Sequence, residues 1–376
     1  MKSSSGAHFV ALDHVRAVAV FMVIAWHFTH GYQGFPIPFN YVPAFFPLAL
    51  LDEGHTGVAL FMTLSGYLFA KLLDGKSIHY PAFLWNRMLR LCPLLLVIII
   101  LCGVREVMSG GSIYAYAVNV AYGVIYPTLP NGGWSITVEF HYYLILPLFL
   151  WMFRKSQFLP LAILLVSLTL RGLIYLQRGE IQSYAYWTIL GRIDQFALGM
   201  FFCQFRAHLA RRHVLALATL LGFAAFYSYF DWHGGFSNHG LYPSPSPLWI
   251  FLPLLEGLAF AVGIAWYDSS FRHSTTGVSG FIGRIGEFSY SIYLLHFFVV
   301  FHAARFVHLR IMNISNFYLA CLWAAVFLLL MMPVGYLSFR FIEAPFLKLR
   351  KRYIKTPRDS QEQSANPPEM VLQQSR

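Results

Sequence analysis

Long apolar runs separated by short polar stretches dominate the chain, and these runs have the length needed to cross a bilayer. The runs 91–102, 158–170, 215–226 and 321–337 contain no charged residue. A helix that spans the hydrocarbon core needs about 20 mostly apolar residues. The pattern therefore predicts an all-α polytopic membrane protein of about ten transmembrane helices. We place them at approximately 13–32, 55–73, 88–104, 134–153, 158–177, 187–206, 213–230, 248–267, 287–306 and 318–339.

Composition and charge support this interpretation. The 376 residues are 57% hydrophobic and 11% charged, whereas about 25% of the residues of a soluble domain are charged. If both termini are cytoplasmic, 21 of the 27 Lys and Arg lie on the inner side of the membrane. The net charge of +11 then follows from the positive-inside rule, with the lipid bilayer as partner and no nucleic acid. The outer six are Arg105, Arg171, Arg178, Arg192, Arg305 and Arg310.

Two stretches do not fit the pattern of spans. Residues 112–127 are short, uncharged and rich in tyrosine, so we expect an interfacial or re-entrant segment there. Residues 351–376 begin basic and become polar, which is typical of a disordered cytoplasmic tail. The expected domain organisation is one transmembrane domain over residues 1–350, followed by this tail.

The first span carries two polar residues whose spacing places them on one face. Arg16 lies near its start, and His27 follows eleven positions later. Eleven residues make about three helical turns, so the two side chains lie on one stripe, roughly 16 Å apart along the axis. An ionisable residue inside a span is costly, which makes His27 a candidate functional residue.

Other polar residues in the spans are also candidate functional residues, and each of them can instead have a structural role. Arg87 and Arg90 are three apart and can bind one anion together, or they can contact lipid headgroups. Ser65 and Tyr67 flank Gly66, which permits close helix packing, so Ser65 can serve either a ligand or the packing.

Three residues are expected to lie deeper or towards the outer side. Glu139 is a functional candidate by its burial within a span, or else forms a structural contact between helices, and its depth predicts that it can meet His27. Arg192 and Asp194 either contact an acceptor or form ion pairs with each other or with neighbouring spans.

Two further residues are assigned structural roles. His296 is expected to be a hydrogen-bonded residue of the core, because a lone histidine on an apolar face usually is. Glu343 lies among inner arginines and is expected to fix helix ends electrostatically. No span shows HxxxH or ExxH spacing and no G-x-S-x-G occurs, so a metal site and a nucleophilic serine are the weaker alternatives.

Taken in order, these residues resemble the acyltransferase-3 family of membrane-bound carbohydrate O-acyltransferases. The resemblance extends from residue 8 to about residue 350 and rests on seven motifs in family order. The motifs are Asp13-x-x-Arg16 with His27, GVALFMTLSGYLF, Arg87-x-x-Arg90, GGWSITVEFHYYL, RIDQFALGM, FSYSIYLLH and FIEAPF.

The resemblance implies transfer of an acyl group, acetyl in most members, from cytoplasmic acyl-CoA to a carbohydrate hydroxyl at a bacterial inner membrane. Arg16, Arg87 and Arg90 would then bind the donor, acetyl-CoA, through charge-assisted contacts with its phosphates. His27 would act as general base or as an acyl carrier, Glu139 would orient it, and Ser65 or Tyr67 would stabilise the oxyanion. The candidate acceptor contacts are Trp134, Arg192 and Asp194.

The sequence also allows two interpretations from other functional classes, a transporter and a nonenzymatic membrane subunit. Buried histidine and glutamate also suit proton-coupled export of a sugar derivative, although no pair of matching halves with interrupted helices is visible. A nonenzymatic membrane subunit would leave His27, Arg87 and Arg90 without constraint. Binding of acyl-CoA separates the enzyme from both.

Overall fold

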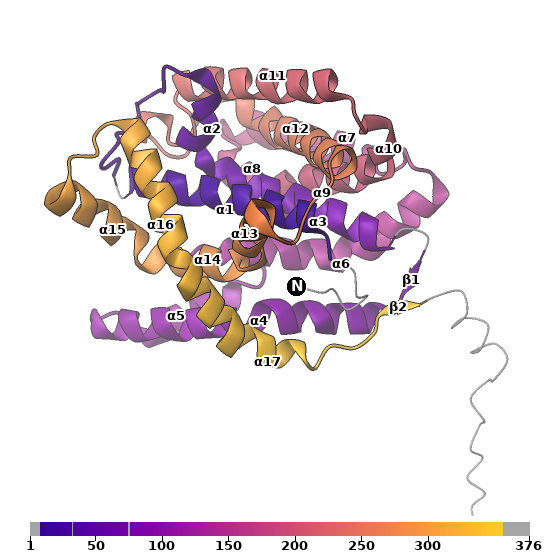
Figure 1. Cartoon of the computed structure of the whole chain (residues 1–376), viewed down its shortest axis with the longest axis horizontal. Helices are drawn as coiled ribbons and strands as arrows, with labels where there is room; N and C mark the ends of the chain where they lie inside the picture. The colour runs from indigo at the N-terminus through magenta and orange to yellow at the C-terminus, as the bar shows by residue number, and fades with distance from the viewer. Residues whose placement is uncertain (1–7, 32, 74–75, 356–376) are drawn as a thin grey trace, which may run out of the picture.

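The computed structural model describes residues 8–31, 33–73 and 76–355, and its regular structure is nearly all helical (Figure 1). In this part of the chain, eight helices are long and apolar enough to cross a membrane. The chain is therefore a multi-pass membrane protein. The eight are α1 (Val10–His30), η2 (Gly54–Thr56) with α3 (Gly57–Leu73) over Gly54–Leu73, α4 (Tyr80–Met108), α6 (Trp134–Lys155), α7 (Leu161–Arg178), α11 (His213–Trp232), α12 (Leu248–Ser270), and α16 (Phe317–Ser338) with η6 (Phe339–Glu343) and α17 (Ala344–Leu347) over Phe317–Leu347.

A bent pair of helices brings the number of candidate spans in the described residues to nine if the pair is taken as one span. The segments Ser289–Phe298 and Val300–Ile311 pass the same test together and are bent by 62° between them. They comprise α14 (Ser289–Leu295), η4 (His296–Phe298), α15 (Val300–Phe306) and the π-helical turn η5 (Val307–Ile311). The expected sixth span corresponds to α9 (Ile189–Gln204), which has only 16 residues. The number of ten spans and the side of the termini stay predictions.

Short elements connect these helices. The helix α5 (Ile113–Tyr122) has ten residues, too few to span, and contacts α4 through Tyr116, whose hydroxyl donates to the Ile99 carbonyl at 2.6 Å. Figure 1 shows α4 and α5 along one edge of the molecule and α11 along the opposite edge. The other short elements are η1 (Phe46–Leu48), α2 (Ala49–Asp52), η2 (Gly54–Thr56), α8 (Gln182–Trp187), α10 (Arg206–Leu209), η3 (Asn238–Gly240), α13 (Gly277–Glu287), η6 (Phe339–Glu343) and α17 (Ala344–Leu347).

Glycine allows the central helices to approach closely. A Cβ atom on Gly66 of α3 would lie 2.1 Å from the Phe196 carbonyl oxygen of α9, which confirms the expected close approach at this glycine. Gly286 of α13 meets the Asp13 carbonyl of α1 in the same way, at 1.8 Å. These contacts bring α1, α3, α9 and α13 together in the interior of the molecule.

The segment 349–355, which we call the C-terminal clasp, lies against the start of α4. Its strand β2 (Ile354–Lys355) pairs antiparallel with β1 (Ser77–Ile78), the strand that precedes α4. Residues 351–355 belong to the tail expected from the sequence, and here they are bound to the transmembrane domain. The rest of that tail, residues 356–376, lies outside the described residues.

Candidate active site

A cavity of about 210 Å³ opens between α1, α3, α4, α6 and α14. Four arginines line it, and we call it the arginine cavity. It contains five of the candidate residues taken from the sequence, contributed by four different helices. They are Arg16, Ser65, Arg87, Arg90 and Glu139.

Neighbouring side chains contact the arginines of the cavity, whose residues line its space. Arg16 donates to Asp13 Oδ1 at 2.5 Å, one helical turn earlier. Arg90 donates to Glu343 Oε2 at 2.9 Å. The Arg87 guanidinium lies over the rings of Phe69 and Phe83, with its carbon 5.2 and 5.6 Å from their centroids. The pairing of Arg90 with Glu343 confirms that Glu343 connects helix ends electrostatically.

Sequence reasoning missed the fourth arginine. Arg350 belongs to the C-terminal clasp and lines the cavity beside Arg87 and Arg90. Burial, and after it the positive charges of Arg87 and Arg90, lower the pKa of the Arg350 guanidinium to about 10. The group therefore stays charged at neutral pH and adds to a concentration of positive charge.

A hydrogen-bonded carboxylate forms another wall of the cavity. Glu139 of α6 accepts hydrogen bonds at Oε1 from the Tyr143 hydroxyl and from Ser65 Oγ of α3, the latter at 3.5 Å. Tyr143 was not a candidate, although its position four residues after Glu139 on one helix face was a usable signal. Glu139 thus connects two helices and also faces the cavity.

His27 lies beyond the cavity wall, beside His296 of the broken helix. Its Nδ1 is 2.8 Å from the Val23 carbonyl oxygen and 3.3 Å from His296 Nε2. The other His296 nitrogen, Nδ1, is 2.5 Å from the Tyr293 carbonyl oxygen. Since carbonyl oxygens only accept, Nδ1 carries the proton in both rings, and the Nε2 lone pair of neutral His27 is left available.

One layer of aromatic rings separates this histidine pair from the cavity. Tyr293 lines the cavity, and its ring centroid lies 6.0 Å from that of Phe61 and 5.9 Å from that of His296. Glu139 therefore does not meet His27 as its depth predicted. His296 is fully buried and hydrogen-bonded, as expected of a core residue, and it also contacts His27.

The family match decides among the classes of protein left open by the sequence. Residues 9–340 match the family model described as "Acyltransferase domain". The chain belongs to the acyltransferase-3 family. A stretch of 170 residues is 27% identical to the peptidoglycan O-acetyltransferase OatA of Listeria monocytogenes, covering 39% of this chain and 24% of that protein. No solved structure matches this chain.

Tyr67 of this acyltransferase points away from the cavity that Ser65 lines. Its hydroxyl donates to Asp268 Oδ2 of α12 at 2.7 Å, and Lys71 Nζ lies 2.6 and 2.5 Å from the two oxygens of the same carboxylate. The three side chains form a polar contact between α3 and α12. The geometry provides Tyr67 with a structural partner, and it does not bring the hydroxyl to Arg87 or Glu139.

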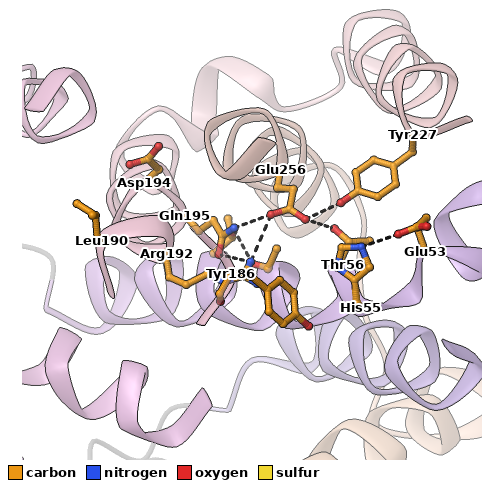
Figure 2. A network of polar contacts seen from close by, with 12 residues as sticks. Glu53, His55, Thr56, Tyr186, Leu190, Arg192, Asp194, Gln195, Tyr227 and Glu256 are labelled. Carbon is orange, nitrogen blue, oxygen red and sulfur yellow. Dashed lines mark hydrogen bonds and ion pairs between the residues drawn. The ribbon is translucent and has the colours of Figure 1, made fainter. Parts of the chain in front are cut away.

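A second group of polar side chains in the acyltransferase, the Glu256 cluster, surrounds one carboxylate of α12 (Figure 2). Glu256 Oε1 accepts from the Tyr227 hydroxyl at 2.6 Å and from Thr56 Oγ1 at 2.7 Å. Its Oε2 accepts from Gln195 at 2.7 Å and lies 3.3 Å from Arg192 Nη1. All five side chains are buried.

The candidate acceptor contacts separate into two places. Trp134 lies beside Arg192, whose guanidinium carbon is 5.8 Å from its ring centroid, so the structure brings these two together. Asp194 points away from Glu256 in Figure 2 and pairs instead with Arg171 at 2.6 Å. Arg192 and Asp194 thus form ion pairs with neighbouring helices rather than with each other.

Metal coordination finds no support among the described residues of this acyltransferase, where no group of three or more His, Cys, Asp or Glu side chains is placed to hold an ion. The carboxylates already named have hydrogen-bonding or ion-pair partners within the protein instead.

Proposed function

We propose that this protein transfers an acetyl group from cytoplasmic acetyl-CoA to a hydroxyl of a cell-surface or lipid-linked carbohydrate at a bacterial inner membrane. The observation that carries the proposal is the arginine cavity, where Arg16, Arg87 and Arg90 from two helices converge on one space. Membership of the acyltransferase-3 family supports the reaction class. The name of the Listeria relative, a peptidoglycan O-acetyltransferase, supports acetyl as the group and a cell-wall sugar as the acceptor class.

The donor enters with its phosphates against the arginines. Guanidinium groups bind phosphate through charge-assisted and bidentate hydrogen bonds, which suits Arg87 and Arg90 at adjacent turns of α4. The Nε atom of Arg87 is buried and has no hydrogen-bond partner in the described part of the chain, so it has a donor to offer. The pantetheine arm then follows the stripe of α1 from Arg16 towards His27, and the Phe61 and Tyr293 rings between the cavity and the histidine pair move aside to admit it.

The chemical step requires a base at the acceptor hydroxyl. Nε2 of His27 removes the hydroxyl proton while the oxygen attacks the thioester carbonyl carbon. The carbon–sulfur bond breaks, and the proton passes from His27 to the departing sulfur. The products are the acetyl ester and CoA in its thiol form, so no further reactant is consumed.

Other residues prepare this step without accepting the acetyl group. The Ser65 hydroxyl is 3.5 Å from Glu139 Oε1, a long hydrogen bond that it can exchange for one to the thioester oxygen. Glu139 positions the cavity wall through Ser65 and Tyr143. His296 holds the His27 ring in the tautomer that leaves Nε2 basic.

The first test is binding of acetyl-CoA to the purified protein in detergent. Wild type should bind, the Arg87→Ala/Arg90→Ala variant should lose binding, and dephospho-CoA should compete less well than CoA. An Arg154→Ala/Lys155→Ala variant removes two exposed charges outside the cavity and should bind as wild type does. Failure of folded wild type to bind would overturn the proposed donor and favour an export function.

The role of His27 is tested separately from donor binding. His27→Ala should abolish transfer, a loss of about 10²- to 10⁴-fold for a general base, with little change in the affinity for acetyl-CoA. Near-normal transfer by this variant would show that another group is the base. A labelled acetyl group trapped on wild-type His27 would instead favour the acyl-histidine mechanism.

A further inference from the structure

The backbone of the C-terminal clasp is hydrogen-bonded to a side chain of α4 and to the residue before α4, and these bonds fix its register. Asn86 of α4 donates from Nδ2 to the Lys351 carbonyl at 2.7 Å and accepts from the Lys351 amide at 2.9 Å. The His79 amide donates to the Tyr353 carbonyl at 2.8 Å. Asn86 is fully buried although it is polar, because the clasp satisfies its amide.

Aromatic packing adds to these hydrogen bonds. Tyr353 is 1% exposed, and its ring lies 5.6 Å from the ring of Phe83 on α4. The same Phe83 ring carries the Arg87 guanidinium. The clasp therefore packs on the part of α4 that supports the cavity, and it does so after the last long helix has ended at Leu347.

This register determines where Arg350 lies. The residue bound by Asn86 is Lys351, so its neighbour Arg350 comes to lie beside Arg87, the neighbour of Asn86 on α4. Both arginines line the cavity together with Arg90. The described part of the chain gives Arg87 no ion pair, and Arg90 shares the carboxylate of Glu343. Glu139 and Glu287 also line the cavity, and three guanidinium groups gathered at one end of it still favour an anionic ligand there.

We propose that the C-terminal clasp is part of the donor site and delivers Arg350 as a third guanidinium for the phosphate groups of the donor. This inference rests on the proposed function, because the donor is the CoA thioester assigned there. The chain segment after the last span then acts in donor binding, and Asn86 is the positioning residue that holds it. Anionic lipid headgroups carry the same phosphate chemistry, so the test separates the two sources.

The experiment measures the dissociation constant of CoA for the full-length protein in detergent free of anionic lipid. Arg350→Gln should weaken binding about tenfold or more, the effect of losing one hydrogen-bonded charge. Lys351→Gln is the matched control, because it removes a positive charge from an exposed side chain of the same segment while keeping the backbone bonds. Asn86→Ala should weaken CoA binding in the same direction through a loosened clasp.

Further arms distinguish recognition of phosphate from support of the fold. The preference for CoA over pantetheine, which lacks the phosphates, should shrink in Arg350→Gln, whereas a merely structural role would change both ligands alike. Arg350→Lys keeps the charge and should recover part of the affinity, which serves if the glutamine variant unfolds. Added phosphatidylglycerol should leave CoA binding by wild type unchanged.

The experiment distinguishes a wrong donor from a wrong role for Arg350. If wild type does not bind CoA, the proposed donor is wrong and this role falls with it. If wild type binds CoA and Arg350→Gln binds equally well, the clasp is structural and the donor site stands without it. Displacement of CoA by phosphatidylglycerol would assign the three arginines to lipid.

Discussion

The arginine cavity and the Glu256 cluster use similar side chains with opposite results. In the Glu256 cluster, four side chains converge on one carboxylate, and each of its oxygens accepts or pairs twice within the protein. In the cavity, Arg87 rests on aromatic rings and faces a space of about 210 Å³. The difference teaches that a buried arginine alone does not indicate a ligand site; what matters is whether the protein itself balances the charge.

The largest effect is expected where this internal balance is broken. Arg192→Met leaves Glu256 buried without its cationic partner, and such a loss costs about 3–5 kcal/mol in the free energy of unfolding. Thermal unfolding in detergent, followed by tryptophan fluorescence, measures the change. Arg192→Met/Glu256→Leu removes both charges and should recover part of the stability. A stable Arg192→Met protein with a raised KM for the acceptor would contradict the structural role of the Glu256 cluster, since the cluster would then be a binding site.

In the arginine cavity we expect a bound anionic ligand to add to the stability of the folded protein. CoA at 100 times its dissociation constant should stabilise wild type by about 2.7 kcal/mol, as mass action requires. The Arg87→Ala/Arg90→Ala variant should gain little under the same CoA concentration. Thermal unfolding with and without CoA measures both. Equal protection of the two proteins would mean that the cavity is not where CoA binds.

A smaller effect is expected at the pair His27 and His296, which belongs to neither region. His296→Phe removes the ring nitrogen that accepts from His27 Nδ1, so kcat should fall about tenfold, the equivalent of one hydrogen bond. The affinity for acetyl-CoA should not change, because His296 does not line the cavity. His296→Gln keeps an acceptor and should restore part of kcat. A change in donor affinity with unaltered kcat would contradict this positioning role.

The smallest effect is expected at Tyr67. Tyr67→Phe removes one hydrogen bond to Asp268, which keeps its two contacts with Lys71, so the protein should lose about 1 kcal/mol of stability. Transfer and donor binding should be normal. A loss of transfer greater than tenfold, with unaltered stability, would return Tyr67 to the oxyanion role that its motif suggested.

Much of the helical architecture followed from the sequence, because apolar length and charge are local properties. These local properties did not predict the bend within Ser289–Ile311, nor that α9 has only 16 residues. With 16 residues α9 is shorter than a typical span, and partners on neighbouring helices balance the charges of its Arg192 and Asp194. Those partners, Arg171 and Glu256, lie on other elements and cannot be read from the spacing on α9.

The site divides in a similar way. Helical periodicity correctly placed Arg87 beside Arg90, because residues three apart share a face. The estimate of depth did not place Glu139 against His27, since equal depth in the membrane does not set which helix faces which. Arg350 could not be found at all, because its position depends on a buried amide at Asn86 and on a two-stranded pairing far along the chain.

The unbroken helix α1 carries a further consequence of the spacing between Arg16 and His27. In the proposed reaction both residues contact one donor molecule, so the helix fixes the distance and the relative orientation of these two contacts. Inserting a single residue between Arg16 and His27 would rotate one side chain relative to the other by about 100° and increase their separation along the axis by about 1.5 Å. Lengthening a surface loop generally costs little free energy. In the proposed reaction the number of residues between Arg16 and His27 has no such freedom, whatever those residues are.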